Sequence, residues 1–229
     1  LIPLKKLYLR LFILTRLSLC YNKGVEYRTA INSDLPECAR LYIDGFKHQL
    51  HTIFGRHIPE KMFIDFLSYV RKLEKNGFIV ACENGKIAGF TIMSVNPLNI
   101  YLNVFFLSFF PSLFNFISGK YSGICFHKVL TSLFDFVKFF RKSSIADRKY
   151  HDAGQVITMV VCESMRGRGI GGNLLKNGLD YLKKHTDTVK LEVRQDNLPA
   201  IQLYKKNQFV EIGEVHSKVG TSLVMVRHL

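Results

Sequence analysis

One glycine-rich run that holds two arginines offers the most specific chemistry in the chain. Glycines let backbone N–H groups approach a ligand closely, and a helix N-terminus adds unpaired N–H groups and the positive end of the helix dipole. The side chains of Arg166 and Arg168 add positive charge. The run lies between an apolar stretch and a helix-forming stretch, in the order Arg166, Gly167, Arg168, Gly169, Ile170, Gly171, Gly172. It therefore predicts a phosphate-binding turn between a strand and a helix.

Other phosphate-binding motifs match this run less well. Gly167, Gly169 and Gly172 satisfy the G-x-G-x-x-G pattern of dinucleotide-binding folds, and Asp187 follows at about the spacing of a ribose ligand. The pattern comes late in the chain, however, and Asp187 precedes the next expected strand instead of ending it, which disfavours this interpretation. A Walker A loop needs Gly-Lys followed by Ser or Thr, and the run lacks it. A purely structural role for the glycine-rich turn is a further alternative.

The run resembles the acetyl-CoA pyrophosphate loop of the GNAT family of N-acetyltransferases, which has the form Arg/Gln-x-x-Gly-x-Gly/Ala. Arg166, Gly169 and Gly171 supply the matching positions. Downstream, the segment 191–209 is similar to the second cofactor segment of the family, especially as it occurs in ribosomal-protein alanine N-acetyltransferases. Two motifs at the expected separation are more specific than one glycine loop, although the similarity over 25–96 is weak.

The resemblance implies an enzyme that moves acetyl from acetyl-CoA to a primary amine by direct attack in a ternary complex. Strand main-chain groups would pair with the pantetheine arm, and loop N–H groups would hold the pyrophosphate. The implied cofactor-binding residues are Met159, Val160, Val161, Arg166, Gly167, Arg168, Gly169, Ile170, Gly171, Gly172, Asn197 and Tyr204. Two of these have a simpler interpretation, because Asn197 can cap the following helix and Tyr204 can pack a helix on the sheet.

Two residues have implied catalytic roles, Tyr204 as the acid that protonates the departing thiolate and Glu192 as the base. Neutralising a lysine-like amine of pKa about 10.4 at pH 7 costs about 4.6 kcal/mol, against about 1 kcal/mol for an α-amine, so a base is useful. Glu192 should face the opposite side of its strand from Leu191 and Val193. The alternative for Glu192 is a solvated or arginine-paired strand position.

Three histidines are alternative bases or surface residues: His127, His151 and His185. The sequence shows no spacing typical of metal ligands, so acetyl-CoA is the expected ligand and no metal site is expected.

The elements around these motifs alternate between strands and helices. An Asn84-Gly85 turn between β-rich runs predicts a hairpin, and Asp34 with Glu37 resembles a capping box. The expected strands are 25–30, 78–82, 87–95, 155–162, 189–194, 209–212 and 222–226, and the expected helices run to 46 from the capping box and over 59–75, 170–185 and 198–207. This order predicts a three-layer α/β domain with a mixed central sheet, which is also the acyl-CoA N-acyltransferase (GNAT) fold that the resemblance implies.

We expect one GNAT acetyltransferase domain over 25–229, with two unusual segments. Residues 1–24 predict a basic amphipathic helix that packs on the domain or lies on an anionic membrane. Residues 97–153 predict a helical hydrophobic insertion. Its stretch 98–117 is long enough to span a bilayer, but one span would separate strands that must share a sheet. An extra packing layer, an acceptor-site lid and a membrane-contacting patch are the alternatives.

Composition limits the class of protein. The 229 residues can bury a sizeable core, and 32 Lys and Arg against 18 Asp and Glu give a charge of +14, which favours anionic partners. Five widely spaced cysteines predict no disulfide framework and a cytoplasmic location, with peripheral contact to an anionic membrane left open. The alternative class is a nonenzymatic nucleic-acid or membrane-binding module, against which the glycine loop argues; no specific nucleic acid is expected. The acceptor amine could belong to a protein N-terminus, an amino sugar, an amino acid or a polyamine, and a homodimer stays open.

Overall fold

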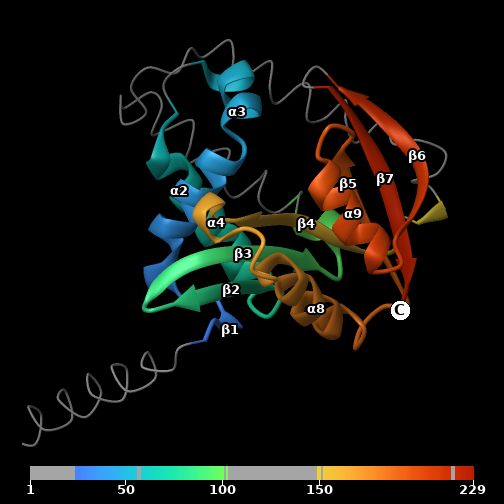
Figure 1. Cartoon of the computed structure of the whole chain (residues 1–229), viewed down its shortest axis with the longest axis horizontal. Coiled ribbons are helices and arrows are strands. Elements are labelled where there is room, and N and C mark those ends of the chain that lie inside the picture. Colours follow the sequence, from blue (N-terminus) through green and yellow to red (C-terminus); the bar gives the residue numbers. More distant parts are fainter. Residues whose placement is uncertain (1–23, 56–57, 101, 103–148, 151, 218–219) are drawn as a thin grey trace, which may run out of the picture.

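A seven-stranded mixed sheet organises the chain, as the computed structural model shows (Figure 1). The structure describes residues 24–229 except 56–57, 101, 103–148, 151 and 218–219. The predicted helix over 1–24 and most of the insertion over 97–153 therefore lie outside the described residues, as do His127 and His151.

The strands follow the order β1-β2-β3-β4-β5-β7-β6 across the sheet. All neighbours are antiparallel except β4 and β5, which are parallel. The prediction of a mixed sheet is confirmed, although the last two strands are longer than expected. The strands are β1 (Glu26–Thr29), β2 (Phe78–Glu83), β3 (Lys86–Ser94), β4 (Gly154–Val161), β5 (Thr188–Arg194), β6 (Val210–Ser217) and β7 (Gly220–His228).

The predicted hairpin connects β2 to β3 through a tight turn. Asn84 and Gly85 have φ of 51° and 77°, the left-handed values that a two-residue hairpin turn requires and that Asn and Gly tolerate. Glu83 pairs with Lys86 across the turn, so strand pairing continues up to the two turn residues.

Helices cover both faces of the sheet, as the alternation of side chains along its strands requires. Val80 and Phe90 belong to the buried cluster that includes residues of α2 (Leu35–Gly45) and α4 (Glu60–Leu73). Ile79 and Ala81 point to the other face and pack with α8 (Ile170–Leu182). α9 (Leu198–Lys206) joins the cluster of α8, β5 and β7. The three layers are therefore confirmed.

Helix α3 (Lys47–Phe54) is an element that the sequence pattern did not predict. The expected helix stops at Phe46, whose φ of −116° and ψ of 20° leave the helical region, and α3 starts at the next residue. Two short 3-10 turns, η1 (Asn32–Asp34) and η2 (Glu163–Met165), precede α2 and the glycine-rich loop.

The predicted capping box at the start of α2 is wrong. Asp34 makes no side-chain cap bond to α2. Its carboxylate instead accepts the Ile31 N–H at 2.8 Å and pairs with Arg28 at 2.7 Å. A bidentate guanidinium attracts this buried carboxylate more strongly than a single backbone donor can, so the side chain turns back toward β1.

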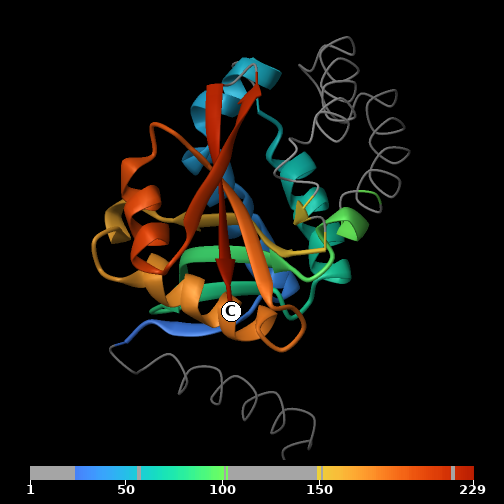
Figure 2. The ribbon, with the colours of Figure 1, turned by 90° about the vertical axis from the view of Figure 1, so that its right-hand side faces the viewer.

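The parallel pair β4 and β5 separates after a short contact. Only Gly154, Gln155 and Val156 pair with β5, opposite Val189, Lys190 and Leu191. β4 continues to Val161 and β5 to Arg194 without pairing to each other, and in Figure 1 the sheet opens between them. Figure 2, turned by 90°, shows β7 and β6 crossing the direction of β2, β3 and β4.

Within the described ranges no helix has both the length and the apolar character needed to cross a bilayer.

Candidate active site

The glycine-rich loop connects β4 to α8 at the open end of the strand pair. Gly167 and Gly169 both have φ of 77°, and a Cβ built on either would meet no atom within 4 Å. Asn173 donates the first hydrogen bond of α8, to the Gly169 carbonyl at 3.1 Å. The N–H groups of Ile170, Gly171 and Gly172 therefore precede the helical hydrogen-bond pattern, as expected for an anion-binding helix start.

The two arginines of the loop have different partners. The Arg166 Nε donates to the Val161 carbonyl at 3.3 Å, and its side chain is otherwise exposed. Arg168 donates two hydrogen bonds to the Glu83 carboxylate, one of them at 2.9 Å, and one to the Met165 Sδ. Its guanidinium is thus turned toward the β2–β3 hairpin. The sequence pattern had predicted that both arginines add charge at the phosphate.

Main-chain groups of β4 face the opening beside β5. Cys162 donates its N–H to the Ala88 carbonyl on β3 at 2.9 Å. Because successive peptide groups of a strand point to alternate sides, Val160 also turns its main chain toward β3, whereas Met159 and Val161 turn theirs toward the opening. Of the three residues with an expected main-chain role, the geometry brings two to the gap.

Tyr204 lies on α9 and is 7% exposed. Its ring contacts Phe209 edge-on, with the centroids 5.7 Å apart, in the cluster that includes Leu191 and Val193. Packing of a helix on the sheet, the simpler interpretation of this residue, is therefore present. Burial also raises the pKa of the Tyr204 phenol to about 12, so the hydroxyl keeps its proton at neutral pH.

Glu192 occupies the exposed face of β5, opposite the buried Leu191 and Val193, as predicted. Arg194 lies two residues further along the strand and on the same face. Since Leu191 and Val193 pack in the cluster of α8 and α9, the face of Glu192 and Arg194 looks toward the other side of the sheet.

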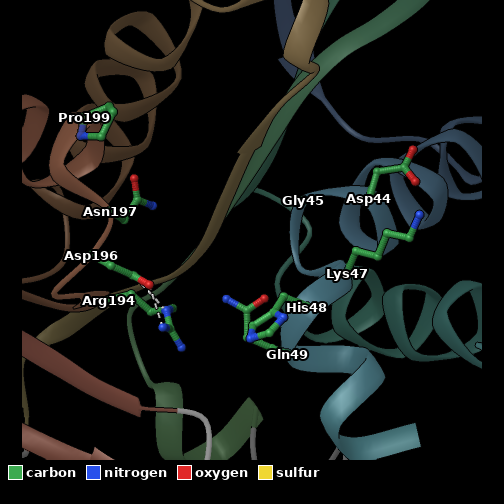
Figure 3. A pocket seen from close by; sticks show the side chains of 9 residues that line it. All are labelled: Asp44, Gly45, Lys47, His48, Gln49, Arg194, Asp196, Asn197 and Pro199. Atoms are coloured by element: carbon green, nitrogen blue, oxygen red, sulfur yellow. Dashed lines mark hydrogen bonds and ion pairs between the residues drawn. The ribbon is translucent and has the colours of Figure 1, made fainter. Parts of the chain in front are cut away.

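A pocket of about 550 Å³ opens on that other side, between the start of α3 and the end of β5 (Figure 3). One wall carries His48 and Gln49, and the facing wall carries Arg194 and Asp196. The complete lining is Asp44, Gly45, Lys47, His48, Gln49, Arg194, Asp196, Asn197 and Pro199. The lining is polar and mixed in charge.

An ion pair stiffens one wall of this pocket. The Arg194 Nε donates to Asp196 Oδ1 at 2.8 Å and its Nη2 to Oδ2 at 2.6 Å. The guanidinium lowers the pKa of the Asp196 carboxyl, and the nearby His48 lowers it further, whereas the pKa of Arg194 is raised. Asp196 is therefore an anion over the whole neutral range.

Asn197 is the N-cap of α9, so its simpler interpretation is confirmed. Its side-chain oxygen accepts the Ala200 N–H at 3.3 Å. The cap uses only the oxygen, and because Asn197 also lines the pocket, the Nδ2 group remains a donor at the end of β5.

His48 is a pocket residue that the sequence pattern did not predict. His185 lies in the turn after α8, where its ring is 5.3 Å from that of Tyr181, and it is not part of the pocket lining. His48 does line it. No spacing signal marks His48, because only the packing of α3 across from β5 brings it there. The described residues contain no group of three or more His, Cys, Asp or Glu arranged to hold a metal ion.

A three-layer mixed sheet that opens behind a glycine-rich loop defines the class of acyl-CoA N-acyltransferase folds. Comparisons with known proteins agree with this class. Residues 135–209 match the model of the acetyltransferase (GNAT) family. The expected resemblance to the GNAT family is confirmed by this match and by the fold.

Individual relatives are similar over different lengths. An N-alpha-acetyltransferase from Sulfolobus acidocaldarius is 43% identical over 61 residues, which are 26% of this chain and 36% of that relative. The chain thus spans about a third of the length of this curated relative.

Two solved structures share the fold. The yncA protein from Salmonella typhimurium, solved with its cofactor acetyl-CoA, has a TM-score of 0.57 at 14% identity and covers 90% of this chain and 94% of its own. The ribosomal-protein-alanine N-acetyltransferase from Brucella melitensis has a TM-score of 0.54 at 15% identity, with 89% and 99% covered. The predicted GNAT fold is therefore confirmed.

Proposed function

We propose that this protein is an N-acetyltransferase that moves acetyl from acetyl-CoA to a primary amine within a ternary complex. The observation that carries the proposal is the opening between β4 and β5 directly beside the glycine-rich loop. A thioester with a long diphosphate-linked arm fits such a site, because the loop offers N–H donors for phosphate and the strand turns main-chain groups toward the opening.

The donor arm would be held by backbone groups. Main-chain groups of Met159 and Val161 face the opening and suit the amides of pantetheine, while Val160 anchors the strand in the core. The N–H groups from Arg166 to Gly172 suit the pyrophosphate, and left-handed Gly167 and Gly169 keep side chains away from it. The exposed Arg166 side chain adds charge there. The Asn197 Nδ2 group would donate a further hydrogen bond to the pantetheine arm.

Transfer requires one bond to form and one to break. The amine nitrogen attacks the thioester carbonyl carbon, the carbon–sulfur bond breaks, and the amine loses a proton, leaving an amide and the CoA thiol. Tyr204 carries its proton at neutral pH and would donate it, or a hydrogen bond, to the developing thiolate. With a pKa of about 12, the phenol is a weaker acid than a thiol of about 8.5, so stabilisation by a hydrogen bond is its main contribution.

The acceptor amine would enter from the side of the pocket. Glu192 lies on the same face of β5 as Arg194, which lines the pocket, so it is placed to take the proton of an incoming ammonium directly or through water. Two carboxylates line the pocket, and Arg194 pairs with one of them, Asp196. A polyamine would need several carboxylates without cationic partners, so the lining favours a small polar amine or a peptide N-terminus.

A named relative supports the α-amine of a protein as the acceptor, since the Sulfolobus protein is called an N-alpha-acetyltransferase. An α-amine is also the easier substrate, because neutralising it at pH 7 costs about 1 kcal/mol.

Calorimetric titration with acetyl-CoA, followed by thiol release with a panel of amines, tests the proposal. We expect binding of acetyl-CoA and thiol release with short peptides above that with spermidine. No binding of acetyl-CoA by the folded protein would refute the assignment. Retention on heparin that falls with salt, in a protein without affinity for acetyl-CoA, would instead favour the nucleic-acid or membrane-binding class.

A further inference from the structure

The β2–β3 hairpin holds the glycine-rich loop by one side chain. Arg168 lies between two glycines that are both in the left-handed region. Its guanidinium donates two hydrogen bonds to Glu83, which is 85 positions away in the sequence. Arg168 is the one residue between Gly167 and Gly169, so its contact with Glu83 connects the middle of the loop to the β2–β3 hairpin.

Glu83 is a firm anchor for this contact. It is the last residue of β2, pairs with Lys86 in the hairpin, and its side chain is 15% exposed, whereas that of Arg168 is 47% exposed. The tight Asn84-Gly85 turn limits the motion of the hairpin end. Glycines, in contrast, have more backbone conformations to lose than any other residue, so the loop gains most from a tether.

We infer that Glu83 is a positioning residue that preorganises the loop for the diphosphate of the donor by holding Arg168. The inference rests on the proposed function for its ligand. In this arrangement Arg168 contributes to diphosphate binding through loop geometry, and its charge is already matched by Glu83. A loop held in its bound shape loses less conformational entropy when the ligand binds.

A purely electrostatic role predicts the opposite sign for one variant. If Arg168 acted as a charge on the diphosphate, Glu83→Ala would remove a competing anion and tighten binding. If Glu83 preorganises the loop, Glu83→Ala weakens binding. Exposed ion pairs of this kind contribute modestly, so the expected loss is about two- to fivefold in the Kd for CoA.

Titration calorimetry with CoA on the full chain separates the two roles. Preorganisation predicts that Glu83→Ala, Arg168→Ala and the double variant weaken binding equally, because each breaks the same contact. The charge role predicts tighter binding in Glu83→Ala and weaker binding in Arg168→Ala and in the double variant, because the last two both lack the charge. Arg168→Lys separates the two roles further, because it keeps the positive charge and loses the bidentate hydrogen bonds to Glu83. It should weaken CoA binding if Glu83 preorganises the loop and leave binding unchanged if Arg168 acts by its charge.

A matched control and a readout without cofactor complete the test. Glu60 on α4 pairs with Arg40 at 2.9 Å, so Glu60→Ala removes the carboxylate of another glutamate–arginine pair and should leave the Kd unchanged. Amide hydrogen exchange of 166–172 in the cofactor-free protein should be faster in Glu83→Ala and unchanged in Glu60→Ala. At saturating acetyl-CoA, the kcat of Glu83→Ala should equal that of the wild-type protein.

The outcomes keep the two proposals apart. Wild-type protein that binds no CoA refutes the proposed function, and the exchange experiment still tests whether Glu83 orders the loop. Wild-type protein that binds CoA, together with Glu83→Ala that binds it equally or more tightly, overturns the positioning role and leaves the proposed function standing.

Discussion

The glycine at the start of α8 allows the sharpest test of the donor site. Gly169 has φ of 77° and no atom within 4 Å of an added Cβ, and Gly85 in the hairpin turn has the same φ and the same empty surroundings. Gly169→Ala and Gly85→Ala therefore impose the same backbone strain in two different places. This pair separates the effect of strain from the effect on a ligand.

The effect on stability follows from the backbone alone. A non-glycine residue in the left-handed region costs about 1–2 kcal/mol, and the loss of unfolded-state freedom on replacing glycine returns about 0.4–1 kcal/mol. Each variant should therefore lose about 1 kcal/mol of unfolding free energy. In a chain of this size, Tm should fall by about 2–4 °C in both.

The effect on the ligand should differ. At Gly169 the methyl group would point into the space that the proposed diphosphate needs and displace it from at least one backbone N–H. A hydrogen bond to a charged group contributes about 1.5–3 kcal/mol, so the Kd for acetyl-CoA should rise about ten- to hundredfold. Gly85→Ala should leave it unchanged, since the hairpin turn donates nothing to the ligand.

Thermal unfolding and titration calorimetry of the same two preparations measure both effects. Similar Tm shifts with a Kd change in Gly169→Ala alone are the expected result. A folded Gly169→Ala with wild-type affinity would refute the assignment of the loop to the diphosphate, as would an equal loss of affinity in both variants.

Four further predictions concern the other residues of the site. Tyr204→Phe should lower kcat with little change in the Kd for acetyl-CoA; an unchanged kcat in thiol-release assays would leave Tyr204 a packing residue. Because the pKa of the Tyr204 phenol is raised to about 12, its protonated form stabilises the fold fully below pH about 10, and this stabilisation should be lost as the pH rises toward about 12. Alkaline denaturation should show a loss of up to about 2–3 kcal/mol of unfolding free energy in the wild type and no such loss in Tyr204→Phe. Glu192→Gln should lose most activity at low pH and recover as pH approaches the pKa of the acceptor, because the free amine then needs no base; a pH-independent loss would indicate positioning. Asn197→Ala should cost about 1 kcal/mol of unfolding free energy through the lost cap, whereas Asn197→Asp keeps the cap and lacks the Nδ2 donor. Weaker acetyl-CoA binding at unchanged Tm in Asn197→Asp would identify a ligand contact, and unchanged binding would show that Asn197 acts only as a cap.

Local patterns along the chain were enough to predict most of the described elements. The hairpin at Asn84-Gly85, the strand before the loop and α8 after it are each specified by residues close together in sequence, through positive φ, alternation and helical periodicity. The orientation of Glu192 followed from the alternation of β5 in the same way. Such features depend on backbone sterics and on which face is apolar, and both are local properties.

At two places the structure differs from what the local sequence pattern predicted. Asp34 had the spacing of a capping box, but Arg28 on β1 competed for its carboxylate. Helix α3 was missed because the chain leaves the helical region only at Phe46 and enters a second helix at the next residue, whereas the pattern predicted that the helix ends there. In both places a contact or a backbone angle outside the pattern determined the result.

Only the tertiary structure decided which groups meet at the site. The opening between β4 and β5 results from strand pairing that stops after Val156, and nothing in either strand's own sequence marks that point. His48 reaches the pocket, and Glu83 reaches Arg168, because the sheet brings together segments that are far apart along the chain. The sequence by itself determined the conformation of the loop and the start of α8, since glycine conformations and helix starts are local. It could not determine the partners of Arg168 or the walls of the pocket, because those depend on non-local packing, in which many weak contacts act together.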